Sequence, residues 1–301
     1  MSRFSEETFN HWKRPASESE EARISNAISM IKDAIRASEE LQNRNIEVFV
    51  QGSYANNTNV RAESDVDVCI MLKDTFYSSY PTGLTREHYG FTAGTNNFQE
   101  FRKSVYRALL GKFGEKGLTP DNKSIKIHSN SYRVDADAVP SFQYRNYRYL
   151  GSRKPKVFKE GVKFYSLSND EIINYPKINI ENGRLKNEQT GRKYKRLVRI
   201  LKRIRYQMIK EGVSVSSKIS SFLIECLVWN IPNNIINNYS SWTERVKAAI
   251  AYLYNKTKNP SECKEWREVS EMLYLFHNGR KWDVKTVNQF LIEMRNYLEF
   301  K

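Results

Sequence analysis

The chain has 301 residues, enough for two domains of about 150 residues each. Lysine and arginine (49) outnumber aspartate and glutamate (34) by 15, while 40% hydrophobic and 13% aromatic content exclude an intrinsically disordered chain. This positive charge predicts attraction to polyanions: nucleic acid, anionic lipid or a nucleoside triphosphate.

The patterns of cysteine, histidine and apolar residues exclude several classes of protein. Three cysteines and four histidines are scattered along the chain, so neither a disulfide framework nor a zinc site is expected. The longest apolar run, residues 222–231, is interrupted by Glu225 and Asn230 and is about half the ~20 residues that span a bilayer. The N-terminus is polar and lacks the pattern of a signal peptide. We therefore expect a cytoplasmic protein that does not contact a membrane.

Hydrophobic periodicity predicts the first elements. Apolar residues with helical spacing follow residue 20 and predict a long helix that ends near Leu41. The β-branched and aromatic run 46–50 predicts a strand that ends at Gly52, followed by a turn and a short helix. Residues 65–72 predict a second strand, whose period of two places Asp65 and Asp67 on one face.

The middle of the chain is harder to assign. Residues 73–98 are rich in Ser, Thr, Gly and Tyr, and so long an irregular segment is typical of a functional excursion. A helix is expected over 101–113, and a pair of strands over 124–139 that ends at Pro140 and carries Asp135 and Asp137 on one face. A tight turn at 181–183 predicts a hairpin between 177–180 and 184–185.

The carboxyl half is predicted to be all helical. Residues 194–210 show a buried apolar stripe. The opposite face of that helix is expected to carry Lys195, Arg196, Arg199, Lys202 and Arg203. The fold class is therefore α+β, a mixed sheet with flanking helices followed by a helical lobe. We expect one domain over residues 1–180 and a second over 181–301, with the long N-terminal helix bridging the two.

Three features suggest chemistry when they are taken together: Gly52-Ser53 after a strand, Asp65-x-Asp67 on the next strand, and Asp137 on a later one. Each alone is weak. Phosphoryl transfer from a triphosphate needs carboxylates that converge on magnesium, a hard ion that prefers oxygen ligands. The amides and hydroxyl of a Gly-Ser turn suit the β- and γ-phosphates. The combination therefore predicts a site for a metal-bound nucleoside triphosphate.

The stretch QGSYANNTNVRAESDVDV, residues 51–68, resembles the polymerase β-type nucleotidyltransferases. Within them the chain is similar to clade E (CdnE) of the bacterial cGAS/DncV-like nucleotidyltransferases (CD-NTases). The similarity covers nearly the whole chain. Further segments that carry it are 4–15, 133–140, 160–166, 194–202, 220–228 and 230–234. The resemblance implies a nucleotidyltransferase core over 1–180, with the N-terminal helix as its spine, and a helical lobe over 181–301.

The resemblance implies a set of catalytic carboxylates. Asp65 and Asp67 match the family's paired metal ligands, and Asp137, in a D-x-x-P context, matches the third. Asp135 lies on the same predicted face and is the competing candidate. The implied metal is Mg²⁺, with Mn²⁺ as the alternative.

Further positions match family residues that bind nucleotides. Those implied to contact the donor triphosphate are Gly52, Ser53, Lys202 and Ser221. Lys202 is otherwise one more solvated charge among its neighbours, and Ser220 serves equally well as the helix cap. Asn169 matches the position at which pyrimidine-accepting clade E enzymes carry asparagine, whose carboxamide offers a donor and an acceptor to uracil. Asparagine also favours turns, which is the simpler explanation.

The resemblance implies a cyclic dinucleotide synthase that joins ribonucleoside triphosphates, UTP and ATP first among them, with release of pyrophosphate. The expected product contains uridine, either cyclic UMP–AMP or a related cyclic pyrimidine dinucleotide. As a second messenger of antiphage (CBASS) signalling, it would activate a downstream effector, and nucleic acid is not required. One alternative is template-independent nucleotide addition to RNA or a small acceptor. Another is a noncatalytic nucleic-acid-binding module, although the carboxylates are intact.

Overall fold

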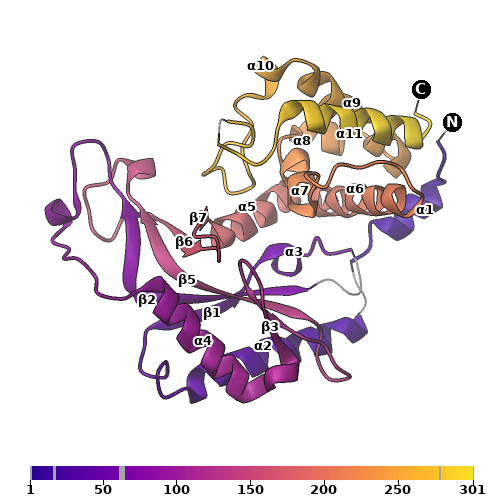
Figure 1. Cartoon of the computed structure of the whole chain (residues 1–301). Coiled ribbons are helices and arrows are strands. Elements are labelled where there is room, and N and C mark those ends of the chain that lie inside the picture. The colour runs from indigo at the N-terminus through magenta and orange to yellow at the C-terminus, as the bar shows by residue number, and fades with distance from the viewer. Residues whose placement is uncertain (1, 16–17, 61–64, 278, 301) are drawn as a thin grey trace. The chain divides into compact units, whose positions relative to one another are not determined.

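The computed structural model describes residues 2–15, 18–60, 65–277 and 279–300, and the chain forms two compact units (Figure 1). The sheet unit comprises Ser17–Ala55 and Arg61–Ile178. The helical unit comprises Met1–Ala16, Asn56–Val60 and Asn179–Lys301. The change of unit at residues 178/179 is close to the predicted boundary at 180/181, but two segments of the amino half belong by their contacts to the helical unit.

The sheet unit is built on a mixed seven-stranded sheet with the order β1-β2-β5-β4-β3, while β6 pairs with both β5 and β7. The strands are β1 (Ile46–Val50), β2 (Val66–Ser79), β3 (Leu118–Pro120), β4 (Ile125–Ile127), β5 (Ala136–Asn146), β6 (Lys159–Tyr165) and β7 (Glu171–Asn174). The central strands β2 and β5 are parallel, and the other pairs are antiparallel.

Two long helices cover one face of this sheet, as Figure 1 shows. The helices of the unit are α2 (Glu18–Ala37), α3 (Gly52–Ala55) and α4 (Phe98–Phe113), with short 3₁₀ turns η1 (Arg86–Tyr89), η2 (Glu115–Gly117) and η3 (Arg148–Leu150). The core beneath α2 and α4 includes Ile31, Val68, Ile70, Phe101, Val105 and Ala138. Because successive side chains of a strand alternate between faces, Asp67 and Cys69 of β2 lie on the face that these helices do not cover.

The predicted elements of this unit are present, with differences in extent. The helix predicted to end near Leu41 ends at Ala37, and by its contacts α2 lies wholly in the sheet unit. The strand predicted over 65–72 continues to Ser79, so part of the expected irregular excursion is β structure.

The prediction that a strand ends at Pro140 was wrong, because β5 continues through it to Asn146. On one side of β5, β4 pairs with Ala136–Ala138 and β6 pairs only from Phe142 onward. Pro140 lies between these two ladders, and on the other side of the strand it is the register partner of Ile70 in β2.

The helical unit is an all-helical bundle, as predicted. Its helices are α1 (Glu6–Trp12), α5 (Pro176–Gln189), α6 (Lys193–Lys210), α7 (Ser221–Trp229), α8 (Asn233–Asn237), α9 (Trp242–Lys258), α10 (Pro260–Cys263) and α11 (Val284–Tyr297), of which α5 begins in the sheet unit. Their core includes Phe9, Leu197, Leu201, Leu223, Ile250 and Leu291. In the described part of the chain, no helix is both long and apolar enough to cross a membrane.

The predicted hairpin around 181–183 was wrong, because this segment lies inside α5. Tertiary contacts override the local turn preference of Asn182 and Gly183. The Asn182 amide donates to the Val269 carbonyl at 2.8 Å, and the Lys186 ammonium donates to the carbonyls of Trp229 and Ile231, each at 2.7 Å.

Candidate active site

Gly52 and Asp67 touch at the start of the sheet. Gly52 follows β1, opens α3 and has φ +69°, a left-handed conformation that favours glycine. A Cβ on Gly52 would lie 2.1 Å from Oδ2 of Asp67, so any side chain at residue 52 would displace this carboxylate. The Gln51 amide donates to the Asp67 carbonyl at 2.8 Å and fixes the two segments in register. The glycine is therefore required both by the turn and by the carboxylate.

The strand register makes Asp67 and Asp137 neighbours. They are partners on the parallel strands β2 and β5, so both side chains lie on the same face of the sheet. Burial, together with the charges of Asp137 and Asp65, raises the pKa of Asp67 to about 7. Burial also raises the pKa of Asp137, opposed by a hydrogen bond from Ser124. Like charges are thus held together with incomplete compensation, the electrostatic environment that a cation relieves.

Asp65 precedes β2 and is more exposed than Asp67. Its Oδ2 lies 3.8 Å from the ammonium of Lys126, and its charge raises the pKa of both other carboxyls. Among the residues that the structure describes, no three acidic, cysteine or histidine side chains are arranged to hold one metal ion. Residues 61–64, including Ser64 of the predicted motif, lie outside the described residues.

Two contacts distinguish Asp137 from Asp135. Asp137 Oδ1 accepts a hydrogen bond from the Ser124 hydroxyl at 2.9 Å and lies beside Asp67. Asp135 comes just before β5, and its Oδ1 accepts from the Ser129 amide at 2.6 Å, which ties it to the loop before the strand. Ser124 was not identified from the sequence, since nothing local distinguishes a serine that ends a loop.

Lys202 lies in the interior of the helical unit. It is 2% exposed, and its ammonium donates to Glu225 Oε2 at 3.1 Å and to the hydroxyl and carbonyl of Thr58 at 3.0 and 3.2 Å. The Thr58 hydroxyl donates to the same Glu225 oxygen at 2.8 Å. The alternative reading of Lys202 as a solvated charge is therefore wrong, while its predicted phosphate contact stays a prediction. Arg199, 6% exposed, is likewise buried and donates to the Asn57 and Lys13 carbonyls. Sequence periodicity did not reveal Glu225 or Thr58 as partners.

The two serines at the start of α7 have different roles. Ser220 is the N-cap, and its hydroxyl accepts from the Leu223 amide at 3.2 Å. The Ser221 hydroxyl lies 2.9 Å from the hydroxyl of Tyr206 on α6. The cap is therefore Ser220, which leaves the Ser221 side chain to other contacts.

Asn169 occupies the turn between β6 and β7. Its φ of +61° is left-handed, a conformation that asparagine tolerates better than most residues. The backbone conformation of this turn therefore favours asparagine at residue 169, whether or not its side chain contacts a base. The side chain is exposed, and its Oδ1 accepts from Gln99 Nε2 at 3.5 Å.

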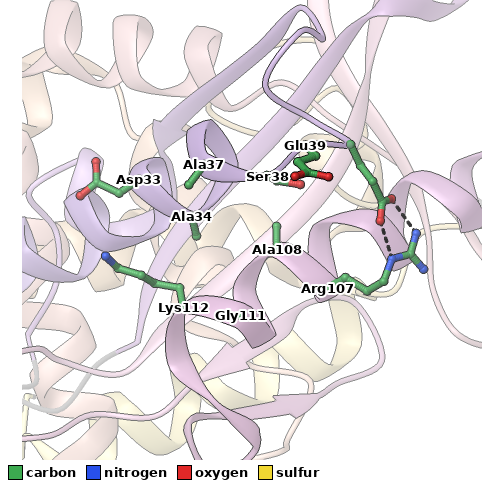
Figure 2. A pocket seen from close by; sticks show the side chains of 10 residues that line it. Asp33, Ala34, Ala37, Ser38, Glu39, Arg107, Ala108, Gly111 and Lys112 are labelled. Atoms are coloured by element: carbon green, nitrogen blue, oxygen red, sulfur yellow. Dashed lines mark hydrogen bonds and ion pairs between the residues drawn. The ribbon is translucent and has the colours of Figure 1, made fainter.

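A shallow hollow of about 530 Å³ lies elsewhere, between α2 and α4 (Figure 2). Small side chains line its floor, and the Arg107 guanidinium at its edge donates to both carboxylate oxygens of Glu40 at 2.8 and 2.6 Å. Since α2 and α4 cover the sheet face opposite Asp67, this hollow is separate from the carboxylates.

The donor chemistry on the sheet face opposite α2 and α4 fits a divalent metal. Asp67 and Asp137 supply hard oxygen ligands side by side, and their raised pKa values reflect charges that a cation would stabilise. Asp65 lies near them, but the three carboxylates do not surround a single point in the described part of the chain.

Similarity to known proteins agrees with this chemistry. Residues 31–140 match the nucleotidyltransferase domain family, and residues 181–299 match the cGAS/DncV-like nucleotidyltransferase C-terminal helical domain. The chain is 45% identical, over all of both chains, to the cyclic dipyrimidine nucleotide synthase CdnE of Cecembia lonarensis.

Two solved structures share the fold. The CdnE cyclic dinucleotide synthase of Elizabethkingia meningoseptica, with GTP and Apcpp, has a TM-score of 0.82 and 36% identity, covering 98% of this chain and 99% of that one. The Rhodothermus marinus CdnE c-UMP-AMP synthase, with Apcpp and Upnpp, has a TM-score of 0.85 and 27% identity, covering 97% and 96%. The α+β fold class and the resemblance predicted from the sequence are confirmed. The chain belongs to the cGAS/DncV-like nucleotidyltransferases, in the CdnE group.

Proposed function

We propose that this protein joins two ribonucleoside triphosphates into a cyclic dinucleotide that contains uridine, with UTP and ATP as its substrates. The names of the Cecembia and Rhodothermus relatives, a dipyrimidine synthase and a cyclic UMP–AMP synthase, support a pyrimidine in the product. The cyclic product would serve as a second messenger in CBASS antiphage signalling. It would diffuse through the cytoplasm to an effector, with no requirement for nucleic acid.

One observation carries the chemical part of this proposal. Asp67 and Asp137 are paired across parallel strands, and Gly52 leaves space for the Asp67 carboxylate beside the turn. A carboxylate pair next to a Gly-Ser turn suits a triphosphate whose charge is neutralised by divalent cations.

Asp65, Asp67 and Asp137 would hold Mg²⁺, with Mn²⁺ as a substitute. When bound, the metal supplies neutralisation of charge on the attacking and leaving oxygens. Gly52 and Ser53 would hold the donor triphosphate through the backbone and hydroxyl of the α3 turn. Phosphate contacts by Lys202 and Ser221 are proposed from the resemblance alone.

The reaction is a phosphoryl transfer in two rounds. In the first, a ribose hydroxyl oxygen of one nucleotide forms a bond to the α-phosphorus of the other, and the bond to pyrophosphate breaks. The proton of the attacking hydroxyl passes to Asp137 or to water. The linear product then binds in the reversed orientation, and a second transfer at the same carboxylates closes the ring and releases a second pyrophosphate.

Asn169 would contribute to base choice. Its carboxamide can donate to and accept from the edge of uracil, which carries both kinds of group. The exposure of the side chain supports this role, although the turn itself also favours asparagine.

The test is incubation with each pair of labelled nucleoside triphosphates and Mg²⁺, followed by phosphatase. The proposal predicts a small, phosphatase-resistant product that contains uridine. Extension of added RNA would instead support template-independent nucleotide addition. Absence of any triphosphate consumption would support a binding module and contradict the proposal.

A further inference from the structure

Hydrogen bonds through the loop between β3 and β4 join two functional positions of the sheet unit. The loop comprises residues 121–124. Asn122 of this loop contacts the turn that carries Asn169, and Ser124 contacts Asp137. Neither the proposed chemistry nor the sequence motifs include its residues.

The first set of contacts holds the turn between β6 and β7. The Leu167 amide donates to both the carbonyl and Oδ1 of Asn122, at 2.9 and 3.0 Å. Within the turn, the Asn169 amide donates to the Ser166 carbonyl at 3.0 Å, and the Asp170 amide donates to the Ser166 hydroxyl at 2.9 Å. The turn is therefore closed internally, and Asn122 holds its Leu167 amide from outside.

The second set of contacts holds the loop itself. Arg102 of α4 is 7% exposed, and its guanidinium donates to the carbonyls of Asp121, Asn122 and Ser124 at 2.5, 3.3 and 3.2 Å. A buried guanidinium with a fixed fork of donors can hold three carbonyls in one geometry, which a flexible ammonium cannot do. One turn earlier on the same helix, Gln99 contacts Asn169.

The third contact ends at the carboxylates. Ser124 is 4% exposed, and its hydroxyl donates to Asp137 Oδ1. Arg102 therefore organises a loop that touches the proposed base-choosing turn with one residue and a proposed catalytic carboxylate with another.

We propose that Asn122 and Arg102 are positioning residues for base choice, which set the placement of Asn169 relative to Asp137. The inference rests on the proposed function, because it assumes that Asn169 contacts a base. Asn122 acts on the turn directly, and Arg102 acts through Asn122. The ligand whose recognition changes is the uracil base of a nucleoside triphosphate.

The experiment compares base choice in Asn122→Ala with that of the wild type. The protein receives equimolar ATP, CTP, GTP and UTP, and the uridine content of the product is measured. Binding of non-hydrolysable UTP and ATP analogues is measured separately. Loss of the Asn122 Oδ1 acceptor is expected to lower the preference for uracil about fivefold in both measurements, the size of one lost hydrogen bond. Turnover with the best substrate pair should change less than the preference.

Lys123→Ala is the matched control, because Lys123 is exposed in the same loop and its side chain makes none of these contacts. It should leave base preference unchanged. Arg102→Lys keeps the positive charge but loses the guanidinium that donates to three loop carbonyls. This variant should shift base preference in the same direction as Asn122→Ala. If Arg102→Lys does not fold, Asn122→Ala still decides the matter, since it removes only an exposed side chain.

A double variant tests whether Asn122 acts through Asn169. In an Asn169→Ser background, Asn122→Ala should produce no further change in base preference, because coupled residues are not additive. Additive effects, or an unchanged preference in Asn122→Ala, would overturn the inference. A purely structural role would lower thermal stability without changing the ratio of bases.

Failure of the inference is distinguishable from failure of the proposed function. A wild type that prefers the UTP analogue but forms no cyclic product contradicts the proposed function alone, and the binding measurements still test Asn122. A wild type that makes the uridine product while Asn122→Ala behaves identically contradicts the inference alone. A wild type without base preference contradicts both.

Discussion

Two clusters of charge, one in each unit, differ in how their charge is compensated. On the sheet, Asp67 and Asp137 lie side by side with Asp65 near, and burial and mutual repulsion raise the pKa of Asp67 to about 7. In the helical unit, the buried carboxylate of Glu225 is paired with Lys202 at 3.1 Å and bonded to Thr58. In the first cluster Lys126 lies only near Asp65, at 3.8 Å, and the repulsion between Asp67 and Asp137 is left uncompensated, whereas the second cluster contains its own counter-charge.

The comparison shows how a binding site can be separated from a structural ion pair. When one partner of a buried ion pair is removed, the other charge is left buried without compensation, and the fold is strongly destabilised. Buried carboxylates whose repulsion is only partly compensated destabilise the metal-free fold, and such a cost is typical of functional sites. Variants of the two clusters should therefore have opposite effects on stability and activity.

The largest effect is expected at the sheet cluster. Asp67→Asn or Asp137→Asn should lower turnover about 1,000-fold or more, because metal-assisted charge stabilisation contributes several kcal/mol. Thermal stability should stay level or rise, since a repulsive charge is removed. Asp135→Asn is the matched control, and retained turnover in this variant is predicted from its separate contact with Ser129. Equal losses in all three variants would remove the distinction between Asp137 and Asp135.

The next effect is expected at the helical cluster. Lys202→Met leaves Glu225 buried without its partner and should destabilise the protein by about 3–5 kcal/mol, or about 10 °C in Tm. Lys202→Met combined with Glu225→Leu should recover most of this loss, because no uncompensated charge remains. Thermal unfolding of the wild type, Lys202→Met, Glu225→Leu and the double variant measures the coupling.

Kinetics of the double variant test the phosphate contact predicted for Lys202. If Lys202 contributes only to folding, the stable double variant should have a nearly unchanged KM for triphosphates. A raised KM at restored stability would support direct contact with phosphate.

Stability of the metal-free protein should fall as pH rises from about 4 to 7. The folded pKa of Asp67, about 7, is above its ordinary value of 3.8, so over this range the folded state holds a proton that the unfolded state has released. The stabilising contribution is complete at low pH and is lost as Asp67 ionises, with a total of a few kcal/mol.

Melting curves across this pH range, with and without Mg²⁺, measure the effect. Mg²⁺ should flatten the dependence, and Asp67→Asn should abolish it. If the melting temperature of the metal-free protein is constant across this pH range, the raised pKa of Asp67 is contradicted.

The smallest effect is expected at Asn169. Asn169→Gly keeps the left-handed backbone of the turn and removes the carboxamide, whereas Asn169→Ser removes the carboxamide and strains the turn. Both should shift base preference toward purines by roughly tenfold if the carboxamide reads uracil. A shift in Asn169→Ser alone, measured by product composition, would assign the effect to the backbone.

The sequence predicted those parts of the fold that local patterns determine. The α+β class, the helical carboxyl half and the strand that carries Asp67 followed from periodicity, and the family followed from a motif with fixed spacing. The segment 181–183 was misassigned because its turn composition is local, whereas the carbonyls that bind Asn182 and Lys186 come from residues far along the chain.

The sequence proposed the residues of the candidate site but gave no information on the residues that surround them. Gly52, Asp65 and Asp67 belong to one motif, so their proximity was foreseeable, and Asp137 was matched through a second segment. The burial of Lys202 was not, because its partners Glu225 and Thr58 are 23 and 144 residues away in sequence. The contact of Ser124 with Asp137 likewise depends on how β4 pairs with β5.

The central claim is that Asp65, Asp67 and Asp137 hold divalent cations beside Gly52. Its most direct test is the anomalous diffraction of Mn²⁺ in crystals of the protein with a non-hydrolysable triphosphate. The account predicts manganese peaks within coordination distance of oxygens from all three aspartates. Manganese bound away from Asp67 and Asp137, with the triphosphate ordered, would contradict it.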